Sequence, residues 1–301
     1  MRTCSCINLI VVILSATTLR GAEPLSFRND VLPVLSKIGC NSGGCHGALA
    51  GKGGFRLSLN AYDPATDHYN ITREMRGRRI EPSAPARSLF VIKPTAAVRH
   101  KGGKVIREDS AEYRILTDWI RQGAPAPSEK DARLERLAVS PPQSVLEKGD
   151  TLQLKVTASF SDGSSRDVTR WVRFASTDAS IAEIDEKTGK VTVLGYGEGS
   201  FTAWYSGRIA IARVTSPWPN KIPAEVFTKA PKRNVIDERV LEQLRRLNLE
   251  PSPPAPDSEF IRRAYVDVIG VLPTPAETKA FIEDKNESKR DVLVDKLLAR
   301  P

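Results

Sequence analysis

The spacing of hydrophobic residues changes along the chain and so divides it into regions. Near the start, apolar residues recur every three or four positions at Phe27, Val31, Val34, Leu35 and Ile38. The same spacing returns at Tyr113, Leu116, Trp119 and Ile120. Such a stripe predicts amphipathic helices, one over residues 26–38 and one before Gly123. For the second helix, the sequence predicts an N-terminal capping box formed by Asp109 and Glu112.

Beyond residue 134 the hydrophobic period becomes two. Apolar and polar residues alternate from Leu152 to Phe160, and Asp162-Gly163 then marks a turn. Four more short apolar runs follow, over 181–184, 190–193, 201–205 and 209–214. Short strands separated by turn residues predict a β-sandwich.

The last region reverts to a helical spacing, which begins with Ile236, Val240 and Leu241. Thr274-Pro275-Ala276-Glu277 reads as a capping box with proline in the first turn. Proline-bearing segments at 124–133 and 217–232 read as linkers. The expected fold is therefore multidomain, with a small all-α domain, an all-β sandwich and the α-helical start of a further domain. The expected boundaries are 25–128, 134–216 and 234–301.

Composition is that of a soluble globular chain, with 301 residues, 40% hydrophobic and 27% charged. Residues 1–22 combine Arg2, an apolar stretch and the small Ala22, so they read as a secretory signal peptide that carries Cys4 and Cys6 away. An uncleaved anchor is the alternative, and no membrane span is expected after cleavage. The formal charge of +9, spread over the chain, indicates solubility rather than nucleic-acid binding.

The segment with the most distinctive chemistry is Gly39-Cys40-Asn41-Ser42-Gly43-Gly44-Cys45-His46-Gly47. Two cysteines followed by histidine resemble the Cys-x-x-Cys-His attachment motif of haem c, although the spacing here is Cys-x4-Cys-His. Cys40 and Cys45 would bind the haem, and His46 would be the proximal ligand of the iron. Gly43 and Gly44 are expected to absorb the extra length. A Cys40–Cys45 disulfide and a zinc site remain alternatives.

A second axial ligand must come from a short inventory. His100 lies just before Gly102-Gly103, where small residues permit a close approach to a haem face. It is the preferred candidate, followed by Met75 and then by no sixth ligand. For His68, an exposed loop residue without a role is the favoured interpretation.

The stretch from Phe27 to Leu35, the cysteine segment, Gly51-Lys52-Gly53-Gly54-Phe55 and the helix ending at Ala124 together resemble a planctomycete-type cytochrome c domain. The resemblance covers about residues 25–128. It implies a haem-binding, electron-transfer-like module in a large envelope protein, and a distal ligand near His100. In this family the run Ser88 to Pro94, which reads as strand-like, precedes that ligand.

Residues 134–216 resemble a bacterial Ig-like domain of group 2, through Phe160-Ser161-Asp162-Gly163-Ser164, Trp171 and Gly189-Lys190-Val191-Thr192. This resemblance implies a surface module, most simply a spacer and sometimes an adhesive unit. The run from Arg262 to Pro275 resembles the opening of a planctomycete domain of unknown function, of which only the N-terminal part is expected here.

The combined interpretation is an exported protein of the periplasm or cell surface that binds haem covalently and transfers electrons to an unknown redox partner. The alternative is a non-redox cell-envelope protein whose Ig-like module contacts the cell surface or polysaccharide. A role associated with a hydrolase is a third possibility, although no catalytic Ser-His-Asp set, phosphate loop or paired carboxylates stand out. Whether the chain is an enzyme is left open.

Overall fold

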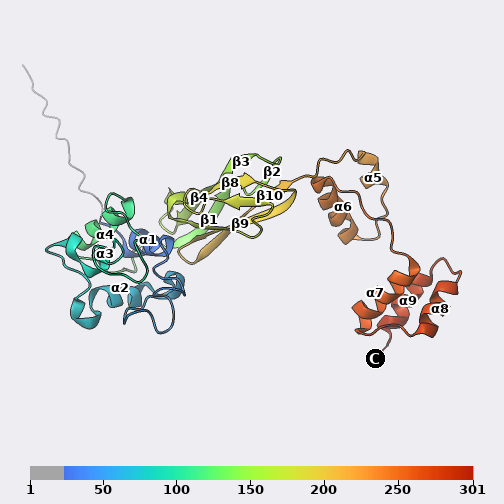
Figure 1. Ribbon diagram of the computed structural model, residues 1–301, viewed down its shortest axis with the longest axis horizontal. Coiled ribbons are helices and arrows are strands. Elements are labelled where there is room, and N and C mark those ends of the chain that lie inside the picture. Colours follow the sequence, from blue (N-terminus) through green and yellow to red (C-terminus); the bar gives the residue numbers. More distant parts are fainter. Residues whose placement is uncertain (1–23, 301) are drawn as a thin grey trace, which may run out of the picture. The chain divides into compact units, whose positions relative to one another are not determined.

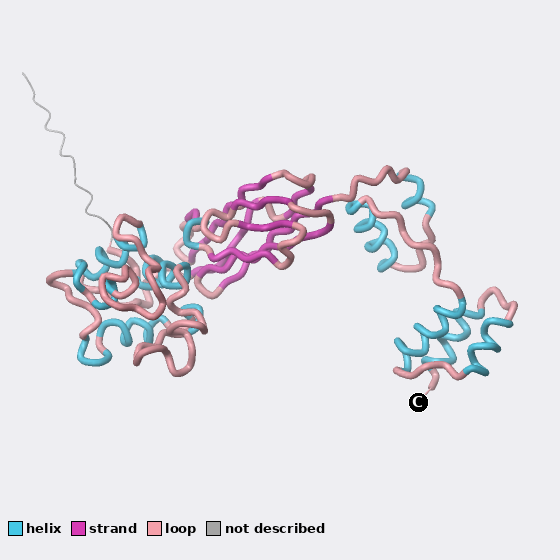
Figure 2. The backbone as a smooth tube through the Cα atoms, viewed as in Figure 1, coloured by secondary structure: helices cyan, strands magenta, loops and turns pink. Residues whose placement is uncertain are grey.

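The computed structural model describes residues 24–300, so the predicted signal peptide with Cys4 and Cys6 lies outside the described residues (Figure 1). The described chain divides into two compact units, one through Pro217 and one from Trp218. Apart from the 3-10 turn Thr169–Trp171, helices and strands occupy separate stretches of sequence, and strands β1 to β10 lie between Leu134 and Ser216 (Figure 2). The predicted order of helical region, sandwich and helical region is confirmed at this level.

The first helical region contains short elements around one core. A π-helical turn, Phe27–Val31, runs directly into α1, and the regular helices of this region are α1 (Leu32–Lys37), α2 (Pro64–Thr72), α3 (Leu89–Ile92) and α4 (Ala111–Arg121). Ser26 accepts a hydrogen bond from the backbone N–H of Asn29 and caps the first turn. Pro33 is tolerated because it lies in the first turn of α1, where its missing N–H has no helical partner.

Helix α4 confirms the predicted apolar stripe, because Leu116, Trp119 and Ile120 are fully buried. Its predicted capping box is wrong. Ser110 is the N-cap and accepts from the backbone N–H of Tyr113 at 3.2 Å, whereas Asp109 forms an ion pair with Arg107. Asp109 and Ser110 can both cap a helix, and the cap is formed by Ser110, which lies one position closer to the first residue of α4.

The run before Pro94 is also not strand-like. Leu89–Ile92 forms the short helix α3, with Phe90 and Val91 buried. Ser88 precedes it and accepts a hydrogen bond from the backbone of Glu81 at 2.9 Å. A continuous apolar run of this length does not by itself distinguish a strand from a buried helical turn.

The sandwich has its own core, which includes Val156, Phe174, Val191 and Phe201. Its strands are β1 (Leu134–Ser140), β2 (Gln143–Val145), β3 (Thr151–Gln153), β4 (Lys155–Phe160), β5 (Ser165–Asp167), β6 (Arg173–Ser176), β7 (Ala182–Ile184), β8 (Lys190–Val193), β9 (Gly197–Tyr205) and β10 (Arg208–Ser216). They form sheets in the orders β1-β4-β5, β2-β10-β9-β6 and β3-β8-β7.

Two strand pairings define the four-stranded sheet β2-β10-β9-β6. Strands β9 and β10 form an antiparallel hairpin from Arg208↔Tyr205 to Ser216↔Gly197. Its turn, Ser206-Gly207, has φ values of 46° and 76°, the left-handed conformation that suits a tight hairpin. Strand β2 pairs with the other edge of β10 in parallel, through Gln143, Ser144 and Val145.

The second unit is helical throughout its regular elements: α5 (Ala224–Lys229), α6 (Val235–Leu247), α7 (Asp257–Ile269), α8 (Pro275–Glu283) and α9 (Lys289–Leu298). Ile261, Phe281 and Leu297 contribute to its core. The predicted capping box at Thr274 is confirmed, because Thr274 and Glu277 bond reciprocally. Ser288 is the N-cap residue of α9 but makes no side-chain capping bond.

Candidate functional site

The cysteine segment forms a loop that closes on itself immediately after α1. The helix ends in a Schellman cap, in which the backbone N–H of Cys40 donates to the Leu35 carbonyl at 2.9 Å and that of Gly39 to the Ser36 carbonyl at 3.2 Å. Gly39 has a φ of +78°, and this left-handed conformation redirects the chain into the motif. Six residues later, the N–H of His46 donates to the Cys40 carbonyl at 2.9 Å. The two ends of the Cys-x4-Cys-His motif are therefore held against each other.

The glycines that this loop needs are not the ones predicted. Gly43 and Gly44 do not have positive φ, and a Cβ on either would meet nothing within 4 Å. Gly47 is different, since its Cβ would lie 2.1 Å from the carbonyl oxygen of Asn41. Asn41 is itself buried and donates to the Ser36 hydroxyl at 2.8 Å. Close backbone packing after the motif, and not extra freedom within it, is what this loop requires.

The loop opens onto a cavity of about 590 Å³, within the range of small-molecule and cofactor sites. Cys40, Cys45, His46 and His100 all line it. Much of the remaining wall is apolar and comes from α1, α3, α4 and the loops between them: Leu35, Ile38, Phe55, Leu89, Phe90, Pro94, Val105, Ile106 and Leu116. The fold thus gathers the four predicted site residues from two distant segments around one apolar space.

Both cavity histidines have one ring nitrogen committed to a backbone carbonyl. Nδ1 of His46 lies 3.0 Å from the Phe55 oxygen, and Nδ1 of His100 lies 2.9 Å from the Gly103 oxygen. A carbonyl can only accept, so Nδ1 carries the proton in each hydrogen bond. The lone pair then resides on Nε2. Imidazoles that bind metals usually donate their other ring N–H in this way.

Burial keeps the two groups at the mouth of the motif uncharged. Burial, reinforced by electrostatic interaction with the nearby Cys45, raises the pKa of the Cys40 thiol to about 12. Burial also lowers the pKa of His46, with the hydrogen bond to Phe55 opposing it and the charges of His100 and Lys52 adding to it. At neutral pH His46 is therefore a neutral imidazole, the form that binds a metal ion.

The charged side chains that line the cavity are all basic: Lys52, Arg78, Arg79, Lys93, Arg99 and Lys101. Among the described residues, no carboxylate lines it. The exposed cations on the rim suit an anionic group. Arg79 differs from the others because its guanidinium is buried, donates to the carbonyls of Asn70 and Gly54 at 2.8 Å, and lies over the Phe55 ring.

Arg79 lines the candidate site but lies within a run of arginines, with Arg73, Arg76 and Arg78, that the sequence pattern alone would assign to a solvated face. Its guanidinium lies 4.7 Å from the centroid of Phe55, whose ring in turn lies 4.7 Å from that of His46. No sequence signal separates Arg79 from its neighbours. The only hint was its position at the end of the cluster, next to the apolar Ile80.

The other two ligand candidates do not line the cavity. His68 belongs to α2 and is half-buried, so its interpretation as an exposed loop residue is wrong. Its Nε2 lies 2.9 Å from the Ala124 carbonyl oxygen, and its ring packs against Phe27 and Trp119. Met75 has 55% of its surface exposed. The structure thus brings His100, and neither His68 nor Met75, to the predicted attachment site.

Three further observations bear on the alternatives of a zinc site, a disulfide and a membrane anchor. Within residues 24–300, no three His, Cys, Asp or Glu side chains are arranged to hold a single metal ion. Cys40 and Cys45 are both free thiols in the structure. Within the same residues, no helix has the length and apolar character needed to cross a membrane.

Two family models match parts of the chain. Residues 135–204 match the model described as bacterial Ig-like domain (group 2). Residues 235–301 match the model PSCyt2, described as a protein of unknown function (DUF1549).

Among curated proteins, an "S-layer-related protein" from Niallia circulans is 43% identical over 70 residues, which make up 23% of this chain and 4% of that relative. This chain therefore spans a small part of the relative's length. Among solved structures, domains 1–6 of the surface layer protein SbsC are 20% identical, with 29% of this chain and 13% of that chain covered and a TM-score of 0.26. For SbsC domains 4 and 5, the identity is 20%, the coverage is 29% and 53%, and the TM-score is 0.26.

The family matches confirm two of the three predicted resemblances. The Ig-like match falls within the β-sandwich, and the second match begins with α6. The chain is thus a multidomain protein in which helices precede a bacterial Ig-like domain of group 2, and a helical region similar to a domain of unknown function follows.

Proposed function

We propose that this chain belongs to an exported cell-envelope protein whose first helical region, residues 25–128, binds haem c covalently. Two features support the envelope assignment. One is the predicted signal sequence, and the other is the 43% identity of 70 residues to a protein named S-layer-related. The Ig-like module would then lie outside the cytoplasm, where haem attachment also takes place in the resembled cytochrome family.

The observation that carries the haem proposal is the shared cavity. Cys40 and Cys45 would hold the haem through its vinyl groups, and His46 would be the proximal ligand of its iron. His100 lines the same cavity and its Nδ1 bonds to the Gly103 carbonyl, so its Nε2 would be the second protein ligand of that iron. The residues present fit the group, because an apolar wall suits the macrocycle and the basic rim suits its propionates. Bound haem would supply one-electron transfer through its iron.

The arrangement of ligands favours haem over a zinc ion. The cavity-lining cysteines and histidines are not arranged around one point that would hold a single ion, whereas zinc requires four donors at 2.0–2.3 Å. Haem would not need all of these donors around one ion, because the two cysteines would bind its edge and the histidines its iron. The redox partner is unidentified, and the exposed rim cations Arg99 and Lys101 favour an acidic one.

The test is to express the exported chain with a haem-attachment system and to extract it with acid–acetone. We expect haem to stay with the protein, and the Cys40→Ser/Cys45→Ser variant to release it. His100→Ala should make the iron high-spin or open to carbon monoxide, and His68→Ala is the matched control that should do neither. A sulfur–iron absorption band that Met75→Leu abolishes would transfer the second ligand to Met75.

The second candidate is a non-redox envelope protein with a Cys40–Cys45 disulfide and an Ig-like module that contacts the cell surface or polysaccharide. It is favoured by the closed loop, in which the N–H of His46 bonds to the Cys40 carbonyl, and by the S-layer-related relative. Intact mass decides between the two. Under conditions that mature other cytochromes, a haem-free protein whose mass is about 2 Da below that of the reduced chain would contradict the haem proposal and support the disulfide.

A further inference from the structure

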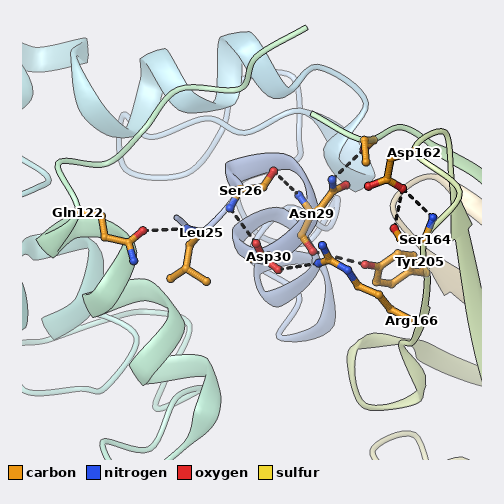
Figure 3. Close-up of polar contacts among 10 residues, drawn as sticks. Leu25, Ser26, Asn29, Asp30, Gln122, Asp162, Ser164, Arg166 and Tyr205 are labelled. Carbon is orange, nitrogen blue, oxygen red and sulfur yellow. Dashed lines mark hydrogen bonds and ion pairs between the residues drawn. The ribbon is translucent and has the colours of Figure 1, made fainter. Parts of the chain in front are cut away.

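The helical segment that precedes Cys40 is held at its N-terminal end by the sandwich. Asn29 Nδ2 donates to the Ala132 carbonyl at 2.8 Å, and the Tyr205 hydroxyl donates to the Asn29 carbonyl at 3.5 Å. Arg166 on β5 forms an ion pair with Asp30 at 3.4 Å. Figure 3 shows Asn29 and Asp30 on the helical side facing Arg166 and Tyr205 on the sandwich side. This end of the segment is therefore tied down by several polar contacts.

The C-terminal end of the same segment is held by Lys37, the last residue of α1. Its Nζ donates to the carbonyls of Val172 and Glu186, each at 2.5 Å. Nζ also lies 6.0 Å from the centroid of the Phe174 ring. Burial lowers the pKa of this ammonium, and the charges of Asp185 and Glu186 oppose that shift. Because the Lys37 ammonium is partly removed from water, the two carbonyl hydrogen bonds must replace the lost hydration, so its position depends on both carbonyls.

Between these two ends, the cores of the two regions share a side chain. Trp171, just before β6, packs against the sandwich core and against the helical core. Its neighbour Arg170 forms an ion pair with Glu112 on α4 at 3.6 Å. The sandwich therefore contacts both α1 and α4, the helices whose Leu35 and Leu116 line the cavity.

The contact at Lys37 lies next to the cavity in sequence. Ile38, Gly39 and Cys40 follow it directly and line the cavity. The chain between has little slack, because Ile38, Gly39 and Cys40 all donate backbone hydrogen bonds to carbonyls of residues 34–36. A displacement of the end of α1 would therefore be passed to Cys40.

We propose that the Ig-like sandwich is a structural part of the cavity-bearing module and that Lys37 is a positioning residue, which anchors α1 to the sandwich and so sets the place of Cys40. The sandwich is then more than a spacer between modules. The inference deepens the proposed function by saying what holds the attachment site, but the contacts that carry it do not depend on which group fills the cavity.

The test follows the accessibility of Cys40 in the haem-free exported chain. Iodoacetamide labelling is measured over time, and tandem mass spectrometry assigns each adduct to Cys40 or Cys45. In the wild type, Cys40 should react slowly because its thiol is only partly exposed and its pKa of about 12 leaves little thiolate. Lys37→Met should raise the rate about tenfold or more, because the population with α1 released grows when the two hydrogen bonds of this half-buried ammonium are lost. Lys37→Arg keeps the charge and should restore part of the protection.

The matched control is Lys148→Met, which removes the same charge from a lysine that also lies over a ring, that of Tyr196 within the sandwich. It should leave Cys40 labelling within twofold of the wild type. Equal labelling of Cys40 in the wild type and in a folded Lys37→Met variant would overturn the proposal. Since no haem takes part, this result is independent of whether the chain is ever loaded.

A second measurement uses the unaltered chain and so does not depend on the variant folding. In a urea series, Cys40 labelling and backbone amide exchange in β9 and β10 should share one midpoint, because the sandwich and the attachment loop open together. If Cys40 became reactive at clearly lower urea while the sandwich amides stayed protected, the two would be independent and the proposal would be wrong.

Discussion

Replacing Gly47 by alanine should destabilise the module that contains the cavity, while the same change at Gly43 should not. The added Cβ at position 47 would lie 2.1 Å from the Asn41 oxygen, 2.7 Å from its carbonyl carbon and 2.9 Å from the Ser42 oxygen. All three are backbone atoms. Approaches under 3.0 Å essentially never occur for a Cβ, so the loop must move by roughly 1 Å to accept the methyl group.

The cost follows from how firmly Asn41 is held. Its side chain is 2% exposed and bonds to Ser36, and its carbonyl accepts from the backbone of Asn60 at 3.2 Å. Overpacking against such a site costs about 1–3 kcal/mol, and because all three close atoms are backbone atoms, which cannot rotate away, we expect about 3 kcal/mol. For a unit of this size, that corresponds to a fall in Tm of about 6–12 °C.

The assay is thermal and urea unfolding of the haem-free exported chain under reducing conditions, followed by circular dichroism. Gly43→Ala is the matched control, since its Cβ meets nothing within 4 Å, and we expect a change within about 0.5 kcal/mol. If Gly47→Ala were as stable as the wild type, the close packing at Asn41 would be refuted. If Gly43→Ala were as costly as Gly47→Ala, the extra two residues of the motif would need glycine after all.

Three further outcomes are expected. Burial raises the pKa of Tyr205 to about 12, above its value in the unfolded chain. The neutral hydroxyl therefore contributes about 2–3 kcal/mol to the free energy of unfolding below pH 10, and this contribution is lost as the pH rises from 10 to 12. Denaturant unfolding measured against pH should show this loss in the wild type but not in Tyr205→Phe. Thr274→Ala should destabilise the second unit by about 1 kcal/mol because it removes a side-chain capping bond. Ser288→Ala should leave the stability of this unit nearly unchanged because Ser288 makes no such bond. Equal effects of the two substitutions in urea unfolding would contradict this reasoning. In limited proteolysis, the first cut should fall within 217–223, at the boundary of the two compact units, and cuts within 124–133 should appear later. Early cleavage within 124–133 would argue against a first unit in which the helical region and the sandwich are packed together.

The sequence predicted the elements whose periodicity is strong. The alternation from Leu152 to Phe160 and the stripe on α4 were recovered because each buries a full face against a core. The pattern failed where local competition decides the outcome, as at Asp109 and Ser110, or where an apolar run is only four residues long, as in α3. The predicted apolar face of α6 is recovered in its second half, where Leu241 is buried and Leu244 and Leu247 are partly buried, whereas Ile236 and Val240 are exposed.

The candidate site was predictable as a set of residue types but not as a place. Cys40, Cys45 and His46 are adjacent in sequence, so their grouping required no tertiary information. His100 was chosen from a short inventory, and its position at the cavity depends on packing that no local pattern encodes. Lys37 and Trp171 were beyond reach for a similar reason. Their partners lie in another module, and a linker composition at 124–133 indicated separation where the structure has contacts.

The parallel pairing of β2 with β10 determines how the sandwich resists tension. The chain enters the sheet near Gln143 and leaves it after Ser216, and parallel strands place those two points at opposite ends of the pair. A pull that reaches β2 through β1 at one end and β10 at the other therefore loads the hydrogen bonds from Arg213 to Pro142 and from Leu146 to Thr215 in shear, so they share the force and break together. In a single-molecule pulling measurement the sandwich should give a distinct rupture peak, and the strands of a surface protein placed in this order would bear a load instead of unzipping one bond at a time.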